Sequence, residues 1–525
     1  MIFNSLPFFV FIGIFLPIFF LSKRQDGLMS WMGVAFGILA ECVLMYGTLN
    51  WNWNWPMHGL VIATAVVARL IGPLKGQHLI CLVGSYVFYG WWDWKFLFLV
   101  AFSTLLDFTL GLLVDRESEE KRRRKMMILS IFMNLGFLGF FKYFNFFISS
   151  AAELLLALGF QPHMATLKIV LPIGISFYTF QSMSYVIDVY RKHMPAEKNF
   201  LKYAAFVSFW PQLVAGPIVR AKDFLPQFNK SHDFNWDRVI SGTGRILWGF
   251  FKKCVIADSL SPFVDQIFAE PNAFASINLL IGVVFYSFQI YCDFSGYSDI
   301  AIGFARILGF DFNENFRKPY FSQNFSEFWS RWHISLSSWL RDYLYIPLGG
   351  NRNGKFGTYR NNMLTMLLGG LWHGANWTFM FWGFLHGMYL IMQRQLGKPF
   401  GTMMSGLRFP NGLKVCTNIA LTYFFTCLAW IFFRATSFGK ATDVIAGIVG
   451  LEGFSFVNVM NKFIVMKGVL LIGILLVVEI SDLKMHWNGL AFRNPAFRIV
   501  AFAALLWLIA FFGTFGGGAF IYFQF

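Results

Sequence analysis

Three histidines fall in the stretch from Pro319 to Leu390, which is largely apolar: His333, His373 and His386. Each is costly there, because the ring nitrogens need hydrogen-bond partners that lipid does not offer. An ionisable residue in a membrane segment therefore indicates a functional site. A neutral imidazole accepts a proton readily and is the most common general base in enzymes. These residue types predict proton-transfer chemistry.

His373 occurs inside an apolar segment, in the sequence GGLWHG at positions 369–374. The glycines permit a backbone or a ligand to come close, and Asn376 adds a polar side chain nearby. A catalytic base and a buried structural histidine are equally compatible with this pattern. His386 follows 13 residues later, about 220° further around a continuous helix. We therefore expect His386 to have a structural role.

His333 belongs to an expected amphipathic helix over residues 328–345. The apolar face of this helix is formed by Trp329, Trp332, Leu336, Trp339, Leu340 and Tyr343, and its polar face by Ser330, Arg331, Ser335, Ser338 and Asp342. His333 lies at the boundary between the faces, with Ser337 and Arg341 one and two turns further on. A nearby arginine favours the neutral imidazole that a general base needs. The alternative is an interfacial histidine that anchors a headgroup or a backbone carbonyl.

Basic residues follow in a loop with the sequence GGNRNGK at positions 349–355. Its spacing is that of a phosphate-binding loop, but Phe356 stands where Ser or Thr would bind magnesium, which excludes a nucleotide-hydrolysing loop. Arg352, Lys355 and Arg360 remain candidates for binding the phosphates of a donor such as coenzyme A. The alternative is a solvated loop that follows the positive-inside rule.

Other catalytic patterns are missing from the sequence. It contains no H-E-x-x-H or other close histidine pair, so no metal site is expected. The segment GISF at 174–177 lacks the second glycine of a nucleophile elbow, and the six cysteines form no C-x-x-C pair. Asp293 and Asp299 point about 240° apart on one predicted helix. They are either buried acids bonded to Ser, Tyr or Arg, or part of a site.

The composition is that of an integral membrane protein. Of the 525 residues, 57% are apolar, 20% aromatic and only 13% charged, against about 25% charged residues in soluble proteins. The net charge of +16 is better explained by topology-setting residues that meet anionic lipid headgroups than by nucleic acid, which we do not expect as a partner. The first apolar run lacks the features of a cleaved signal peptide and is expected to remain as a helix.

Segments long enough to cross a bilayer recur along the chain. They fall near 3–21, 31–48, 58–73, 78–92, 95–114, 127–149, 240–258, 276–308, 361–375, 377–394, 417–434, 463–481 and 497–513. The charge run at 115–125 is expected on the cytoplasmic side. Pro and Gly interrupt the apolar stretches at 171–177, 209–211 and 215–217, which predicts interrupted or re-entrant helices around a cavity. We expect an all-α polytopic membrane protein with one domain over 1–525.

Several motifs occur together in this chain. They are WHISLSSWLRDY at 332–343, LGGNR at 348–352, LWHG at 371–374, LPIGISF at 171–177, AGP at 215–217, DFSGYSD at 293–299 and FIYFQF at 520–525. In this combination the sequence resembles the membrane-bound O-acyltransferase (MBOAT) family. It is most similar to the branch of bacterial alginate O-acetyltransferase membrane subunits, which also serves cellulose and other surface polysaccharides. The resemblance covers a core at 80–525, whereas 25–75 looks like an insertion of extra helices.

The resemblance implies a multi-helix bundle around a central tunnel, with re-entrant and interfacial helices, in the bacterial inner membrane. It implies acetyl-CoA as donor substrate with no bound cofactor. It also implies a polysaccharide acceptor and a separate periplasmic protein that receives the acetyl group or places it on the polymer. His373 matches the signature histidine of the family and His333 its second active-site polar residue. We therefore expect His373 to be the general base and His333 to orient the hydroxyl or share the proton.

Three other functions are alternatives to this one. D-alanyl transfer to teichoic acid differs in using a carrier-protein thioester as donor. A secondary transporter would have interrupted helices paired in two halves, which the sequence does not show. A membrane-embedded protease needs a framed serine nucleophile, which is also missing from the sequence.

Overall fold

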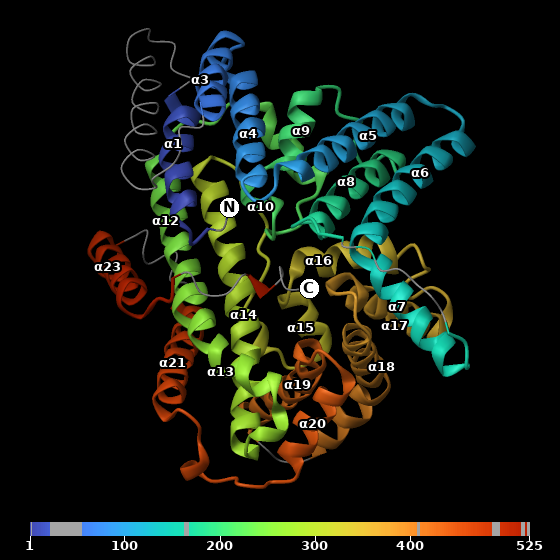
Figure 1. Ribbon diagram of the computed structural model, residues 1–525, viewed down its shortest axis with the longest axis vertical. Coiled ribbons are helices and arrows are strands. Elements are labelled where there is room, and N and C mark those ends of the chain that lie inside the picture. Colours follow the sequence, from blue (N-terminus) through green and yellow to red (C-terminus); the bar gives the residue numbers. More distant parts are fainter. Residues whose placement is uncertain are drawn as a thin grey trace. The chain divides into compact units, whose positions relative to one another are not determined.

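The computed structural model describes residues 1, 3–21, 55–161, 167, 169–406, 410–485, 494–515 and 520–521. Every regular element in these ranges is a helix (Figure 1). Within them, helices long and apolar enough to cross a membrane cover Trp94–Arg116, Glu120–Ala157, Ser276–Ile307, Asn411–Arg434, Lys462–Asp482 and Pro495–Phe512, and a shorter apolar helix covers Leu6–Phe20. The prediction of an all-α polytopic membrane protein is confirmed.

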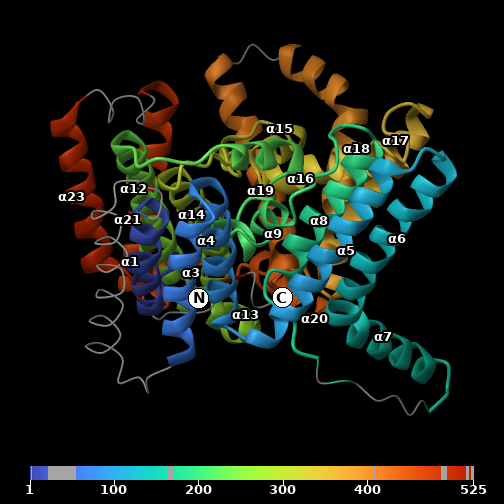
Figure 2. The ribbon, with the colours of Figure 1, turned by 90° about the horizontal axis from the view of Figure 1, so that it is seen from above.

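The chain divides into two compact units, of which the first comprises Met1–Ile246 and Ile300–Asn313. Its helices are α1 (Leu6–Leu21), α3 (Trp55–Leu70), α4 (Pro73–Gly90), α5 (Leu97–Arg116), α6 (Glu120–Leu138), α7 (Phe144–Ala157), α8 (Ile175–Tyr190), α9 (Phe200–Ser208), α10 (Trp210–Leu213) and α11 (Ala221–Phe224), with most of α12 (Trp236–Phe250). Helices α5, α6 and α8 pack against one another (Figure 2).

One interrupted helix of the first unit lies where the sequence predicts it. Phe209, just before Pro211, has an extended ψ of 109° and separates α9 from α10. The break is buried, so its freed backbone groups need partners from the protein. The carbonyl oxygen of Phe206 has such partners, because the side-chain amides of Gln181 and Gln212 both donate to it, at 2.9 and 3.1 Å. The predicted break is confirmed, whereas a tunnel beside it stays a prediction.

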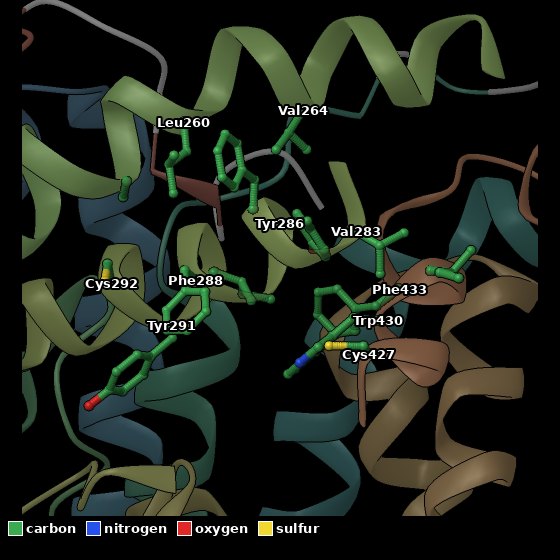
Figure 3. Close-up of a cluster of buried hydrophobic side chains, with 14 of the residues drawn as sticks. Leu260, Val264, Val283, Tyr286, Phe288, Tyr291, Cys292, Cys427, Trp430 and Phe433 are labelled. Atoms are coloured by element: carbon green, nitrogen blue, oxygen red, sulfur yellow. The ribbon is translucent and has the colours of Figure 1, made fainter. Parts of the chain in front are cut away.

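The second unit comprises Leu247–Asp299 and Glu314–Phe525. Its elements are η4 (Phe251–Ala257), α13 (Asp258–Ala269), the larger part of α14 (Ser276–Ile307), α15 (Phe325–Arg331), α16 (Ile334–Leu340), η7 (Arg341–Tyr345), α17 (Gly354–His373), α18 (Trp377–Gly406), α19 (Asn411–Arg434), α20 (Phe438–Val449), α21 (Lys462–Met485) and α23 (Pro495–Phe512). Aromatic side chains of α14 and α19, including Tyr286, Tyr291, Trp430 and Phe433, belong to its buried core (Figure 3).

Helices α17 and α18 follow each other directly and are in close backbone contact. A Cβ atom added at Gly370 would lie 2.3 Å from the carbonyl oxygen of Phe379, and one at Gly383 would lie 2.3 Å from that of Met366. Larger residues at these positions would therefore force the helices apart. The predicted role of the glycines around His373, to let backbones approach, is confirmed for Gly370.

Two predictions about the domain organisation concern regions that the structure describes only in part. Residues 22–54, which hold much of the proposed insertion at 25–75, lie outside the described residues, and α3 covers the remainder up to Leu70. The single domain over 1–525 and the core at 80–525 stay predictions. The charge run at 115–125 crosses from the end of α5 to the start of α6, and Arg123 within it pairs with Glu120 at 3.0 Å.

Candidate functional site

His333 lies at a break in the helix predicted over 328–345. Helix α15 ends at Arg331 and α16 begins at Ile334, and His333 between them has a φ of 42° and a ψ of 54°, in the left-handed region. A non-glycine residue in such a conformation costs about 1–3 kcal/mol, and residues of this kind cluster at active sites. The prediction of one continuous amphipathic helix is wrong.

The break also changes which residues accompany His333. The Ser337 hydroxyl donates to the carbonyl oxygen of Trp332 at 3.1 Å, and Arg341 pairs with Asp342 at 2.7 Å. The helix does continue from His333 to Ser337, whose backbone N–H donates to the His333 carbonyl oxygen at 2.9 Å. The Arg341 side chain is 63% exposed whereas His333 is buried, so an arginine beside the imidazole stays a prediction. The apolar face is buried as predicted at Trp332, Leu336, Trp339 and Leu340.

Asn315, which the sequence analysis missed, holds this break together. Its backbone carbonyl accepts from the Ile334 N–H at 2.9 Å, and its Oδ1 accepts from the Ser335 N–H at 3.2 Å. These N–H groups begin α16 and have no partner within the helix. Oδ1 also lies 3.1 Å from His333 Nδ1 and accepts from the Ser335 hydroxyl at 2.9 Å, while Nδ2 donates to the Ser298 hydroxyl at 3.0 Å. Ser335 is buried, so its predicted place on a polar face is wrong.

His373 is the last residue of α17 and is buried. Its ring contacts Trp372, Trp382 and Phe433, with distances between ring centroids of 5.0, 5.1 and 5.3 Å. Asn376, the polar neighbour noted in the sequence, accepts from the backbone N–H of residue 378 at 3.0 Å and donates to the carbonyl of residue 436 at 3.0 Å. With these two hydrogen bonds, Asn376 stabilises the N-terminal end of α18.

The indole rings of Trp372 and Trp382 lie between the three histidines and contact them. Trp372 contacts His333 with 5.9 Å between ring centroids and His373 with 5.0 Å. Trp382 contacts His373 at 5.1 Å and His386 at 4.8 Å. The structure thus brings both predicted catalytic histidines to one side chain, and it places His386 at the end of the same row of rings.

His386 is fully buried among aromatic rings. Its ring stacks on Phe328 with an interplanar angle of 9° and meets Trp329 and Tyr389 edge to face. Among the described residues, neither of its ring nitrogens has a hydrogen-bond partner. A buried polar atom without a partner costs about 1–3 kcal/mol. The expected structural role therefore stays a prediction that a stability measurement can test.

The substitution His386→Phe is expected to leave the melting temperature of the purified protein unchanged or to raise it. Phenylalanine keeps the ring contacts and removes the two buried polar atoms. Thermal unfolding in detergent, followed by intrinsic fluorescence, measures this, with Phe328→Ala as a control that opens a cavity in the same cluster. A clear fall for His386→Phe would mean that the imidazole nitrogens have partners in the folded protein.

The three basic candidates are exposed and lie away from His373. Lys355 is in the first turn of α17 and Arg360 follows in the next turns, while Arg352 precedes the helix. At 1.5 Å per residue, Lys355 and Arg360 are about 27 and 20 Å from His373 along the helix axis. Coenzyme A carries its phosphates and its thioester at opposite ends of a long arm. Binding of the donor phosphates by these residues stays a prediction.

Two adjacent lysines of η4 were also missed. Lys253 Nζ lies 2.8 Å from Asp258 and 2.6 Å from Asp293, and Lys252 pairs with Asp299. All five side chains are buried. The aspartates of the DFSGYSD segment therefore have lysine counter-charges, a partner that the sequence analysis did not consider.

In the described part of the chain, no group of three or more His, Cys, Asp or Glu side chains lies close enough to hold a metal ion.

Burial lowers the pKa of His333 to about 3, whereas an unfolded histidine has a pKa of about 6.5. Below the unfolded pKa, the unfolded chain binds a proton that the folded protein excludes. The free energy of unfolding should therefore decrease as the pH is lowered from about 6.5 towards 3. His333 contributes about 1.4 kcal/mol to this decrease for each pH unit. The melting temperature should drop less between pH 7 and pH 5 in His333→Gln than in the wild type. An equal drop in the melting temperature of both proteins would contradict the lowered pKa of His333.

Comparison with known proteins identifies the family. The sequence model of the membrane-bound O-acyltransferase family matches residues 190–433. The chain is 47% identical over 361 residues to the probable alginate O-acetylase of Pseudomonas aeruginosa, covering 68% of this chain and 67% of that protein. It is 47% identical over 367 residues to the probable alginate O-acetylase of Pseudomonas putida, covering 69% and 73%. It is 36% identical over 407 residues to the peptidoglycan O-acetyltransferase of Helicobacter pylori, covering 73% and 75%. The protein belongs to the membrane-bound O-acyltransferase family and is an acyltransferase.

Proposed function

We propose that this acyltransferase moves an acetyl group from cytoplasmic acetyl-CoA to a hydroxyl group of a polysaccharide, such as alginate, outside the bacterial inner membrane. One observation carries the proposal: His333 and His373 contact the same indole, Trp372, in a chain 47% identical to a probable alginate O-acetylase. The acetyl group reaches the polymer directly or through a serine of a periplasmic partner protein.

The proposed reaction is a direct acyl transfer. His373 takes the proton of the acceptor hydroxyl as the oxygen attacks the carbonyl carbon of the thioester. The carbon–sulfur bond then breaks, and the leaving thiolate receives the proton from His373, which releases free coenzyme A. His333 orients the hydroxyl or shares its proton. No covalent intermediate with the enzyme is needed, and an ester forms as the thioester is consumed.

The donor is proposed to bind through both of its ends. Arg352, Lys355 and Arg360 are exposed and would meet its phosphates, because a guanidinium or ammonium group pairs well with phosphate oxygens. The thioester would reach the histidines at the other end of α17. The length of this helix suits a donor whose charged and reactive ends lie far apart.

Acetyl-CoA turnover by the full-length protein in nanodiscs tests this function. With [¹⁴C]acetyl-CoA and alginate oligosaccharides, with or without candidate periplasmic partners, we expect labelled acetyl ester on the acceptor and an equal amount of free coenzyme A. The protein with no acceptor present is the control. Transfer of labelled D-alanine from a carrier protein to teichoic acid, with no use of acetyl-CoA, would contradict the proposal and identify the other donor.

A further inference from the structure

We infer that Asn315 is a positioning residue that fixes His333 in the Nδ1–H tautomer, so that Nε2 meets the substrates only as a hydrogen-bond acceptor. The catalytic consequence of this inference rests on the proposed function, whereas the tautomer itself does not. Asn315 and His333 are both fully buried, and one group beside them can act only as a hydrogen-bond donor.

That donor is the backbone N–H of Ser335, which lies 3.2 Å from the Asn315 amide. A backbone N–H can only donate, so the amide atom facing it must be the carbonyl oxygen, Oδ1. The amide nitrogen Nδ2 then faces the Ser298 hydroxyl at 3.0 Å and donates to it. The positions of the oxygen and the nitrogen of the Asn315 amide therefore follow from Ser335 and Ser298, without reference to the histidine.

The orientation of the amide determines the proton on the imidazole. Oδ1 has no hydrogen, so His333 Nδ1, which lies 3.1 Å away, must supply one. In the rival arrangement the Ser335 hydroxyl donates to Nδ1, but this distance is 3.4 Å, against 2.9 Å to Oδ1. This rival arrangement would also leave the lone pair of His333 Nδ1 facing a lone pair of Asn315 Oδ1. A neutral imidazole carries one ring hydrogen, so Nε2 has the lone pair.

The surroundings of His333 favour this neutral form. Its ring contacts Phe294 and Phe316 at 4.6 and 6.2 Å between centroids, besides Trp372. None of these side chains, nor Asn315, carries a charge that would stabilise an imidazolium ion. An amide at Nδ1 holds the tautomer, whereas a carboxylate in the same place would raise the pKa of the imidazole.

The tautomer restricts what His333 can do in acyl transfer. A lone pair at Nε2 repels the oxyanion that develops on the acetyl carbonyl, which needs N–H donors. The same lone pair accepts a hydrogen bond from the acceptor hydroxyl, or from the N–H that His373 gains when it takes the proton. His333 therefore acts on the hydroxyl side of the reaction, and another group must stabilise the oxyanion.

Nitrogen NMR spectroscopy of ¹⁵N-histidine-labelled protein tests the tautomer without an assay. The signals of His333 are found by comparison with His333→Gln. At pH 7 we expect a protonated Nδ1 and an unprotonated Nε2, which differ strongly in ¹⁵N chemical shift. A protonated Nε2, in the other tautomer or in an imidazolium ion, would overturn the inference, even if acetyl transfer is found. The expected spectrum with no acetyl transfer would remove the proposed function and leave the tautomer standing.

The variant Asn315→Asp tests the positioning role by its pH profile. The carboxylate should raise the pKa of His333 by about 1–3 units, so that Nε2 becomes protonated at higher pH and cannot accept. The pH profile of the His333 ¹⁵N chemical shifts should show this rise, starting from the wild-type pKa of about 3 that burial gives His333. Ser298→Ala, which removes only the partner of Nδ2, is the matched control and should keep the wild-type pKa of His333. A folded Asn315→Asp protein in which the pKa of His333 is unchanged would contradict the inference.

Discussion

Replacing His373 with alanine is expected to lower kcat by about 10²- to 10⁴-fold, the usual contribution of a general base. The imidazole is lost while the contact between α17 and α18 remains, because that contact is made by glycines and backbone around Gly370 and Gly383. Alanine also opens a cavity between the rings of Trp372, Trp382 and Phe433, so the melting temperature should fall, and the rates are compared well below it. Release of free coenzyme A from acetyl-CoA, measured with an acceptor present, gives the rate.

His386→Phe is the matched control for this prediction. It also replaces a buried histidine next to Trp382, in the same pair of helices, but the mechanism gives it no part. We expect it to keep an activity within about threefold of the wild type, as residues outside the chemistry usually do. Equal losses in His373→Ala and His386→Phe would show that packing of the row of rings, not proton transfer, limits the rate.

Replacing Lys253 with methionine is expected to destabilise the second unit by about 3–5 kcal/mol. Lys253 pairs with both Asp258 and Asp293, and each of the three side chains is at most 6% exposed. Methionine fills the space of the lysine stem but leaves two buried carboxyl groups without a counter-charge. Thermal and denaturant unfolding in detergent measure the loss.

Arg434→Met is the matched control for Lys253→Met. Arg434 pairs with Asp265 at 2.6 Å, but the aspartate side chain is 53% exposed, so the pair contributes only about 0–1 kcal/mol. A second change, Asp293→Asn, made together with Lys253→Met should restore part of the lost stability, since one uncompensated charge is removed. Similar losses for Lys253→Met and Arg434→Met would contradict a buried ion pair.

The helices are the part of the fold that the sequence predicts well. An apolar run of about 20 residues spans a bilayer as a helix, and α14, α19 and α21 lie close to the bounds expected from their apolar segments. The glycines beside His373 were also interpreted correctly, because only a residue without a side chain permits such close contact.

The details of the site depend on residues far apart in the chain, which periodicity does not reveal. The break at His333 has no Gly or Pro to announce it, and the left-handed backbone is held by Asn315. Asn315 itself lies outside the prominent motifs. Lys253 and Asp293 are 40 residues apart, and nothing in either segment alone shows that they pair. Two adjacent lysines in an apolar segment are a signal of buried acids, and the sequence analysis did not use it.

The direct succession of α17 and α18 has a consequence for the order of folding. Contacts between segments that are neighbours in the chain close short loops at small entropic cost and form early. His373, Trp382 and His386 all lie in this pair of helices, so their row of rings can assemble from one continuous stretch. His333 depends on Asn315 and Ser298, which come from separate stretches. We therefore expect His373 to be placed before His333 during folding. Under the proposed mechanism, the enzyme would become active only once His333 is in place.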